Sequence, residues 1–215
     1  MTDRLIRWIV ASWFLLLAVT IAFGIGTVLA ADTALTELDY TRLASKACLL
    51  SFLAMMGYLT LVRDTPVAQA AGWQPRVSAL VGTNLVFIGI LFLAPRTDLG
   101  IFYHLLSAGL ILTGNLLGIY VLSHLGRSFS IMAEARKLVS DGPYGVIRHP
   151  LYLAEQIAIL GIFIQYASLA AALLITVHFT FQIQRMLNEE MILGATFPEY
   201  AAYMARTARL VPAIW

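Results

Sequence analysis

Charged residues are scarce in this chain. Only 12% of its 215 residues are Asp, Glu, Lys or Arg, whereas 60% are hydrophobic and the mean hydropathy is +0.82. Soluble domains carry about 25% charged residues. A water-soluble globular core, a nucleic-acid-binding surface and a disordered tail are excluded, because each needs more charge or a basic face. We therefore expect an integral membrane protein that does not bind nucleic acid.

Cysteine and histidine are equally sparse. Cys48 is the only cysteine, which excludes an intramolecular disulfide. His104, His124 and His178 stand singly in apolar stretches without a second ligand at metal spacing, so we expect helix-packing histidines and no metal site. Phosphate-binding loops, dinucleotide fingerprints, nucleophile elbows and paired-histidine zinc motifs are also missing from the sequence. Any chemistry must depend on other residues.

Long uncharged stretches dominate what is present. About 20 apolar residues cross the hydrocarbon core of a bilayer. Five stretches lack Asp, Glu, Lys and Arg: 8–31, 47–62, 77–95, 99–126 and 156–184. The first follows Arg4 and Arg7, as a signal peptide would, but its apolar length exceeds the usual 7 to 15 residues, so we expect a retained span.

The last hydrophobic run is too long for one upright helix. Residues 151–184 would extend roughly 51 Å at 1.5 Å per residue. The polar and small residues Gln165-Tyr166-Ala167-Ser168 are the one weak point, so we expect a C-terminal hairpin of two short spans of roughly 16 residues each. The predicted fold is an all-α polytopic membrane bundle of about six helices, or five if this run is a single tilted helix.

Basic residues predict the orientation. With six spans, 11 of the 14 Lys and Arg residues fall on the side of the termini. The positive-inside rule then places both termini and the polar loop around residues 125–150 in the cytoplasm. We expect one membrane domain over residues 1–215, with N-terminal helices over 1–120 and a catalytic region over 121–215.

Two polar clusters could carry chemistry. The loop at residues 126–152 reads GRSFSIMAEARKLVSDGPYGVIRHPLY, and it places Arg148 and His149 directly before a helix that starts at Pro150. Exposed backbone N–H groups at such a start bind anions. The second cluster is RMLNEE, in which Arg185 and Glu189 share a helix face as a surface pair or as the lining of a polar cavity.

The tail FPEYAAYMARTARLVP has an amphipathic pattern. Its polar and aromatic residues recur every three positions, namely at Tyr200, Tyr203, Arg206 and Arg209. We expect a surface helix that caps the site or lies at the lipid headgroups.

Three ordered segments carry a family resemblance. LVSDGPYGVIRHPLY, then RMLNEE, then FPEYAAYMARTARLVP resemble the isoprenylcysteine carboxyl methyltransferase family and its phospholipid methyltransferase relatives over roughly residues 120–212. The resemblance implies a membrane methyltransferase that uses S-adenosylmethionine, held in a cytoplasm-facing pocket by the last two spans. The implied cofactor contacts are Arg136, Lys137, Leu138, Val139, Tyr144, His149, Pro150, Leu151, Tyr152 and Glu189. Arg185 matches the arginine that faces the methyl acceptor, and Arg185 and Glu189 are the candidate catalytic residues.

Two departures keep a rival reading open. Gly145 follows the GPY turn where the family often has an aromatic or basic residue, and Ala154-Glu155-Gln156 replaces a Gly-containing stretch. Glu155 completes an RHPxYxxE pattern that resembles membrane sterol reductases, which use NADPH. The GPY turn and the double acid Glu189-Glu190 favour methyl transfer. A non-catalytic membrane protein with the same fold is the third alternative.

The expected reaction is methyl transfer to a lipophilic acceptor that enters from the bilayer, with membrane lipid as the surroundings. A carboxylate acceptor is already ionised and needs no base, so Arg185 could clamp it by two parallel hydrogen bonds. An amine or a phenol would need a base, for which Glu190 or His149 would be nearest. O- and N-methylation, and the oligomeric state, stay open at this point.

Overall fold

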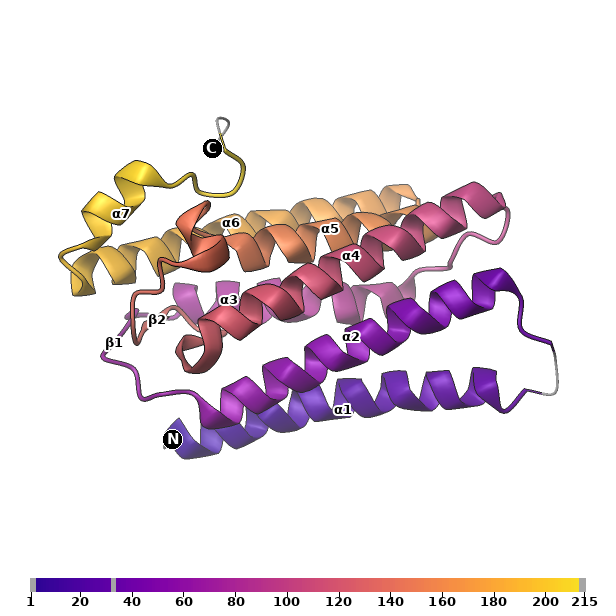
Figure 1. Cartoon of the computed structure of the whole chain (residues 1–215), viewed down its shortest axis with the longest axis horizontal. Helices are drawn as coiled ribbons and strands as arrows, with labels where there is room; N and C mark the ends of the chain where they lie inside the picture. Colours follow the sequence, from indigo (N-terminus) through magenta and orange to yellow (C-terminus); the bar gives the residue numbers. More distant parts are fainter. Residues whose placement is uncertain (1–2, 32–33, 213–215) are drawn as a thin grey trace.

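The computed structural model describes residues 3–31 and 34–212, which are mostly helical (Figure 1). Six long helices are followed by one short one: α1 Asp3–Leu29, α2 Glu37–Val62, α3 Gln74–Gly89, α4 Ile101–Leu125, α5 Pro150–Tyr166, α6 Leu169–Thr196 and α7 Tyr200–Arg206. The remaining elements are single turns or two-residue strands: β1 Ala68–Gln69, β2 Glu134–Ala135, and the 3-10 turns η1 Ile90–Phe92, η2 Gly126–Ser128 and η3 Gly142–Gly145. Strands β1 and β2 pair antiparallel.

Local sequence sets the helix ends near the site. Gly126 follows α4 with a positive φ of 51°, a conformation that glycine adopts at little cost. Helix α5 begins at Pro150, where a missing N–H costs nothing. The Ser168 side chain caps α6 by accepting from the backbone N of Ala171 at 3.1 Å.

Four helices are long and apolar enough to cross a membrane among the described residues. They comprise residues Arg4–Leu29, Glu37–Val62, Gln74–Phe92 and Ile101–Ser128, and α5 is a shorter apolar helix. The helical, multi-pass fold expected from the sequence is therefore confirmed. The count of six spans stays a prediction.

The C-terminal hairpin turns where the sequence predicts it. Helix α5 ends at Tyr166 and α6 begins at Leu169. Helix α6 runs for 28 residues to Thr196, past the apolar run and through the polar RMLNEE segment, and the lengths of the two spans stay a prediction. These polar side chains do not end the helix, since several of them face the interior of the protein.

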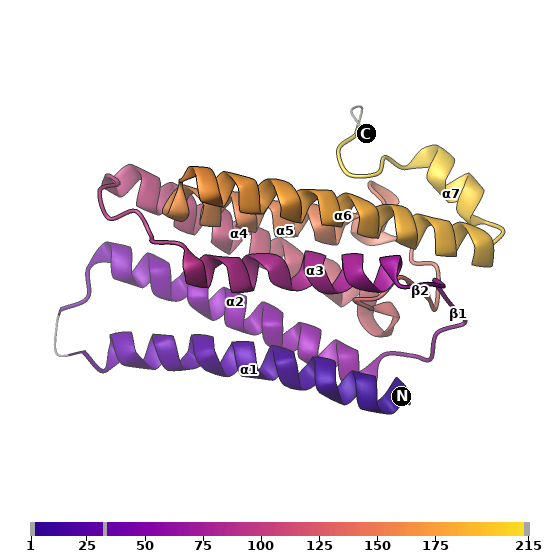
Figure 2. The same cartoon turned by 180° about the vertical axis from the view of Figure 1, so that it is seen from behind.

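Helix packing separates the two arms of this hairpin. Helix α5 packs closely on α4, whereas α6 packs on α3 (Figures 1 and 2). A Cβ at Gly114 of α4 would lie 2.5 Å from the backbone N of Ala158, so glycine permits the close approach to α5. Helices α1 and α3 are joined by Trp13, whose indole donates to Asn84 Oδ1 at 2.7 Å.

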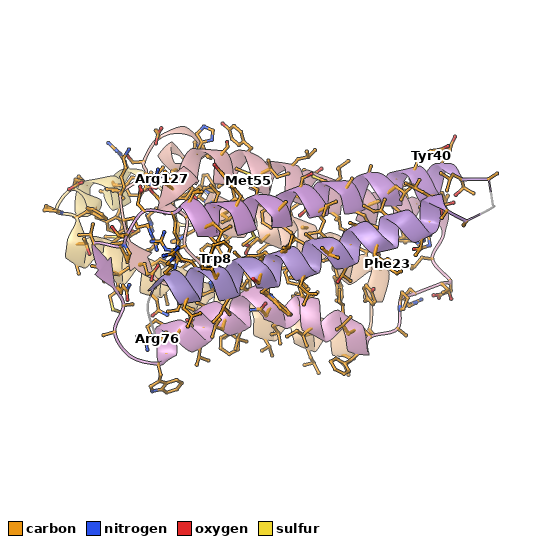
Figure 3. The ribbon with its side chains drawn as sticks, turned by 90° about the horizontal axis from the view of Figure 1, so that it is seen from below. Trp8, Phe23, Tyr40, Met55, Arg76 and Arg127 are labelled. Atoms are coloured by element: carbon orange, nitrogen blue, oxygen red, sulfur yellow. The ribbon has the colours of Figure 1, made fainter. Side chains whose placement is uncertain are left out.

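One end of the bundle collects the basic residues. Figure 3 shows Arg76 and Arg127 at this end and Tyr40 at the opposite one. The start of α1, the loop between α4 and α5, and α7 lie at the basic end (Figure 1). Residues 1–2 and 213–215 lie outside the described residues. The positions of the two termini and the cytoplasmic orientation stay predictions.

Candidate active site

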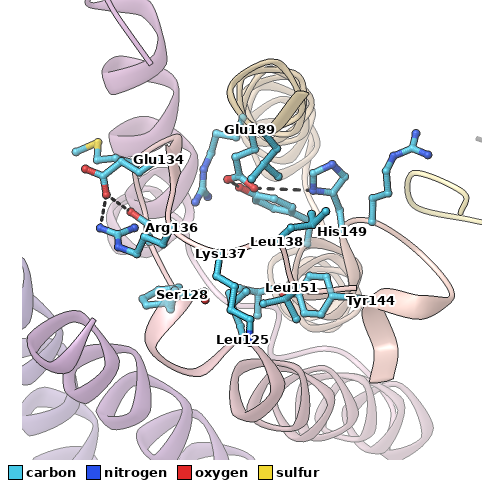
Figure 4. A pocket seen from close by; sticks show the side chains of 18 of the residues that line it. Leu125, Ser128, Glu134, Arg136, Lys137, Leu138, Tyr144, His149, Leu151 and Glu189 are labelled. Atoms are coloured by element: carbon cyan, nitrogen blue, oxygen red, sulfur yellow. Dashed lines mark hydrogen bonds and ion pairs between the residues drawn. The ribbon is translucent and has the colours of Figure 1, made fainter. Parts of the chain in front are cut away.

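A cavity opens at the basic end of the bundle, between the 126–149 loop and the ends of α5 and α6 (Figure 4). Its empty volume is about 900 Å³, part of it open to solvent. Every site residue expected from the sequence lines it except Pro150, which is buried at the start of α5. The lining set is Arg136, Lys137, Leu138, Val139, Tyr144, His149, Leu151, Tyr152, Arg185 and Glu189. The fold thus gathers residues up to 53 positions apart, between Arg136 and Glu189.

Arg136 fixes the loop that forms one wall. Its Nε donates to the carbonyl oxygen of Asp64 at 2.7 Å, and its Nη2 lies 2.6 Å from Glu134 Oε2. Arg136 is buried and is held by protein groups on two sides. These bonds fix the position of the next lining residues, Lys137, Leu138 and Val139. Lys137 is exposed beside the cavity.

Glu190 holds the back of the site together. It accepts hydrogen bonds from Arg148 Nε at 2.8 Å and from Arg209 Nε and Nη2 at 3.0 and 2.8 Å. His149 Nε2 lies 3.1 Å from the same carboxylate. The anion site expected around Arg148 and His149 is therefore filled by the chain's own carboxylate. Because the Glu190 carboxylate already accepts these hydrogen bonds, it is not available as a general base.

The tail closes over the cavity by backbone pairing and by two tyrosines. Ile147 and Ala208 form a parallel bridge, in which Arg148 N donates to Ala208 O at 2.8 Å. Tyr200 and Tyr203 of α7 are buried and line the cavity. Of the two roles expected for the tail, capping the site is the one that the packing supports.

Tyr203 connects this cap to the GPY turn. Its hydroxyl donates to the backbone oxygen of Tyr144 at 2.8 Å. Burial raises the pKa of Tyr203 to about 12 and raises that of Tyr144 further above its ordinary value. Both side chains are therefore neutral phenols at physiological pH.

Arg185 lies inside the bundle and not on its surface. Its Nη1 donates to Gln182 Oε1 at 2.9 Å, and its guanidinium carbon lies 4.9 Å from the centre of the Tyr152 ring. Gly82 of α3 provides the space, because a Cβ there would lie 2.7 Å from Arg185 Cδ. Arg185 Nε is buried and has no hydrogen-bond partner among the described residues. The surface-pair reading of Arg185 and Glu189 is wrong, and one donor is left for a ligand.

Glu189 faces the cavity. The Tyr152 hydroxyl donates to its Oε1, and His149 Nδ1 lies 3.9 Å from its Oε2. A quarter of its side chain, 25%, is still exposed. Its second oxygen can therefore accept from a cationic ligand.

Comparison with known proteins supports the resemblance drawn from the motifs. Residues 102–199 match the phospholipid methyltransferase family. This family stands in the same group as the isoprenylcysteine carboxyl methyltransferases, so the resemblance is confirmed. The matched region contains every lining residue that the sequence predicted, but not Tyr200 and Tyr203.

Two curated proteins are similar to part of the chain. The cobalt-zinc-cadmium resistance protein CzcN of Cupriavidus metallidurans is 34% identical over 108 residues, which are 48% of this chain and 50% of that protein. The nickel-cobalt-cadmium resistance protein NccN of Alcaligenes xylosoxydans xylosoxydans is 29% identical over 112 residues, which are 50% and 52% of the two chains. The matches thus span about half the length of these relatives. In the part of this chain that the structure describes, no group of three or more His, Cys, Asp or Glu could hold a metal ion.

Two further residues belong to the site: Glu155, which the sequence indicated only as part of a reductase-like pattern, and Gln182, which the sequence analysis did not identify. Glu155 lines the cavity, and Gln182 Nε2 donates to its Oε2 at 2.6 Å. Helical spacing could have found them, because Gln182 shares a face with Arg185 and Glu189, and Glu155 stands three residues after Tyr152. Polar residues at this spacing in an apolar helix indicate an internal site.

Proposed function

We propose that this protein transfers the methyl group of S-adenosylmethionine to a lipophilic acceptor that reaches the site from the bilayer. One observation carries the proposal: the segments that resemble the methyltransferase motifs lie far apart in sequence but line a single cavity. The match to a methyltransferase family over the first two of these segments supports it.

The residues of the cavity fit such a cofactor. Glu189 offers a carboxylate oxygen to its cationic amine, and the exposed Lys137 offers a counter-charge to its carboxylate. The hydroxyl of Tyr200 is buried without a partner among the described residues, so it can bond a polar group of the cofactor. Leu138, Val139 and Leu151 supply apolar contacts.

The chain's contribution to the chemistry is alignment in a dry site. S-adenosylmethionine supplies a methyl group on a sulfonium, which is lost by in-line displacement. Holding two reactants near contact distance can contribute ~7 to 11 kcal/mol. Arg185 has an unused donor for the acceptor, and α7 covers the cavity from the solvent side. Carboxyl O-methylation, with Arg185 as the clamp, is the form of the reaction that the family resemblance favours.

An apolar groove offers a route from the bilayer. It lies between α1 and α3, has an empty volume of about 1510 Å³ and is lined by Ile9, Trp13 and Leu80. Met132 lines both this groove and the cofactor cavity. A lipophilic acceptor in the hydrocarbon core could therefore approach the site without crossing water.

Ligand binding tests the proposal against an NADPH-dependent reductase, the rival that Glu155 supports. We expect S-adenosylhomocysteine to raise the unfolding temperature of the detergent-purified protein, since a ligand at 100 times its Kd stabilises by ~2.7 kcal/mol. NADPH should have no effect. Glu189→Gln should cut the shift to about half or less at the same concentration, whereas Glu37→Gln, at the exposed start of α2, should retain it. Stabilisation by NADPH and not by S-adenosylhomocysteine would establish the reductase instead.

A further inference from the structure

A second cavity lies in the centre of the bundle, where all six long helices meet. It is lined by Phe14 of α1, Met56 of α2, Gly82 of α3, Asn115 of α4 and the side chains Glu155 and His178 of α5 and α6, among others. Its volume is about 150 Å³. An apolar cavity of about this size binds a molecule such as benzene. The cavity therefore suits a compact lipophilic group.

Polar atoms in this apolar chamber lack partners. His178 is only 3% exposed, and its Nδ1 makes no hydrogen bond within the described residues. Its Nε2 is 3.3 Å from Gln156 Nε2, so one ring nitrogen is engaged and the other is not. Thr83 Oγ1 is a second buried atom without a partner in the described ranges. A buried polar atom left without a partner costs about 1 to 3 kcal/mol, so these two atoms are available to bond a ligand.

Glu155 joins the two cavities. It lines both the central chamber and the cofactor cavity, as Met56 also does. Arg185 donates to Gln182, and Gln182 donates to Glu155 Oε2, so a relay of two hydrogen bonds fixes this oxygen. Glu155 Oε1 has no hydrogen-bond partner among the described side chains. A carboxylate oxygen is thus available at the junction where an acceptor would meet the methyl donor.

We propose that the central chamber holds the acceptor, a compact lipophile whose nucleophilic atom carries a proton, and that Glu155 removes this proton during methyl transfer. The inference rests on the proposed function. The nucleophile is a hydroxyl, a thiol or an amine: its bond to the methyl carbon forms as the carbon–sulfur bond breaks, the electron pair goes to sulfur, and the proton goes to Glu155. The sulfonium becomes a neutral thioether, so charge and atoms balance.

The same carboxylate disfavours a carboxylate acceptor. Glu155 and Glu189 already bring two acidic side chains to Arg185, and a third negative charge would be repelled. A base at Glu155 therefore favours a hydroxyl, thiol or amine as the acceptor. The family resemblance instead implies a carboxylate acceptor that is held by Arg185. His178 Nδ1 and Thr83 are placed to bond a second polar group on the acceptor.

Four probes of similar chain length separate these possibilities: 4-octylphenol, decanethiol, decylamine and decanoic acid. We expect at least one of the first three to stabilise the S-adenosylhomocysteine complex and to accept radiolabelled methyl from S-adenosylmethionine. Glu155→Gln should bind S-adenosylhomocysteine as the parent does but transfer methyl at least ~100-fold more slowly, since general base catalysis contributes 10²- to 10⁴-fold. Glu37→Gln, an exposed acid at the far end of the bundle, is the matched control.

Each other result overturns the inference. Binding of decanoic acid alone, binding of none of the four probes, or parent-like turnover by Glu155→Gln would each exclude Glu155 as the base for an acceptor in the central chamber. If the parent protein does not bind S-adenosylhomocysteine, the proposed function itself is refuted. The two failures are therefore distinguishable.

Discussion

Replacing Glu190 by Gln should lower the unfolding temperature of this protein without changing the ligand-binding role proposed for Glu189. The Glu190 carboxylate accepts hydrogen bonds from Arg148 and Arg209. All three side chains are largely buried, with exposures of 9% for Glu190, 10% for Arg148 and 20% for Arg209. Gln keeps the shape of the side chain but loses the charge and places an NH₂ group against a guanidinium. The cations then lie buried without their counter-ion.

The size of the effect follows from this burial. Removing one partner of a buried ion pair costs about 3 to 5 kcal/mol, chiefly because the other charge is left uncompensated. In a domain of this length, 1 kcal/mol shifts the unfolding temperature by roughly 2 to 4 °C. We therefore expect Glu190→Gln to lower the unfolding temperature by roughly 6 to 20 °C.

Cys48 provides the assay, because it is buried and is the only cysteine in the chain. A thiol-reactive dye reports its exposure as the detergent-solubilised protein is heated. Glu189→Gln is the matched comparison: its unfolding temperature should stay within about 2 °C of the parent, but its affinity for S-adenosylhomocysteine should fall about 10- to 150-fold, as for the loss of a charge-assisted hydrogen bond. An unchanged unfolding temperature in Glu190→Gln would refute the structural role of this carboxylate.

Three further substitutions test the rest of the site. Gly82→Ala should displace Arg185, because the new Cβ would lie 2.7 Å from Arg185 Cδ, and methyl transfer should fall at least ~10-fold, whereas Gly109→Ala, with nothing within 4 Å of its Cβ, should match the parent. Arg185→Lys should keep S-adenosylhomocysteine binding but slow methyl transfer at least ~10-fold in the radiolabel assay, because Lys lacks the planar guanidinium fork. Normal turnover by this variant would show that Arg185 has only a structural role. Tyr203→Phe removes the bond to Tyr144 O and should cost ~1 kcal/mol by chemical denaturation. With the pKa of Tyr203 raised to about 12, this difference should be the same at pH 6 and pH 9, and a difference that vanishes at pH 9 would contradict it.

Much of the helical framework follows from composition and spacing. Uncharged stretches marked the helices, and small residues marked the turn after Tyr166, because apolar length and helix-breaking residues are local properties. The end of α6 could not be placed in this way. Its charged residues look like the end of a span, but Arg185 and Asn188 are buried, and a buried polar face permits the helix to continue.

The partners of the site residues were the harder part. The motifs indicated which residues gather at the cavity. They did not indicate that the hydrogen-bond partner of His149 is Glu190, which is 41 positions away. The pairing of Glu155 with Gln182 across 27 positions is likewise set by how α5 and α6 face each other. Such contacts depend on tertiary packing, which sequence periodicity within one helix does not specify.

The pairing of α3 with α6 has a consequence for biogenesis. Asn188 of α6 donates to Ser78 of α3 at 3.0 Å, and the two residues are 110 positions apart. At synthesis rates of about 5 to 20 residues per second, α3 waits roughly 5 to 20 s in the membrane before its partner helix exists. During this interval the face of α3 that packs on α6 has no partner, so it can contact other helices and quality-control proteases. Slowing the ribosome between these helices should therefore reduce the yield of folded protein, even though no amino acid is changed.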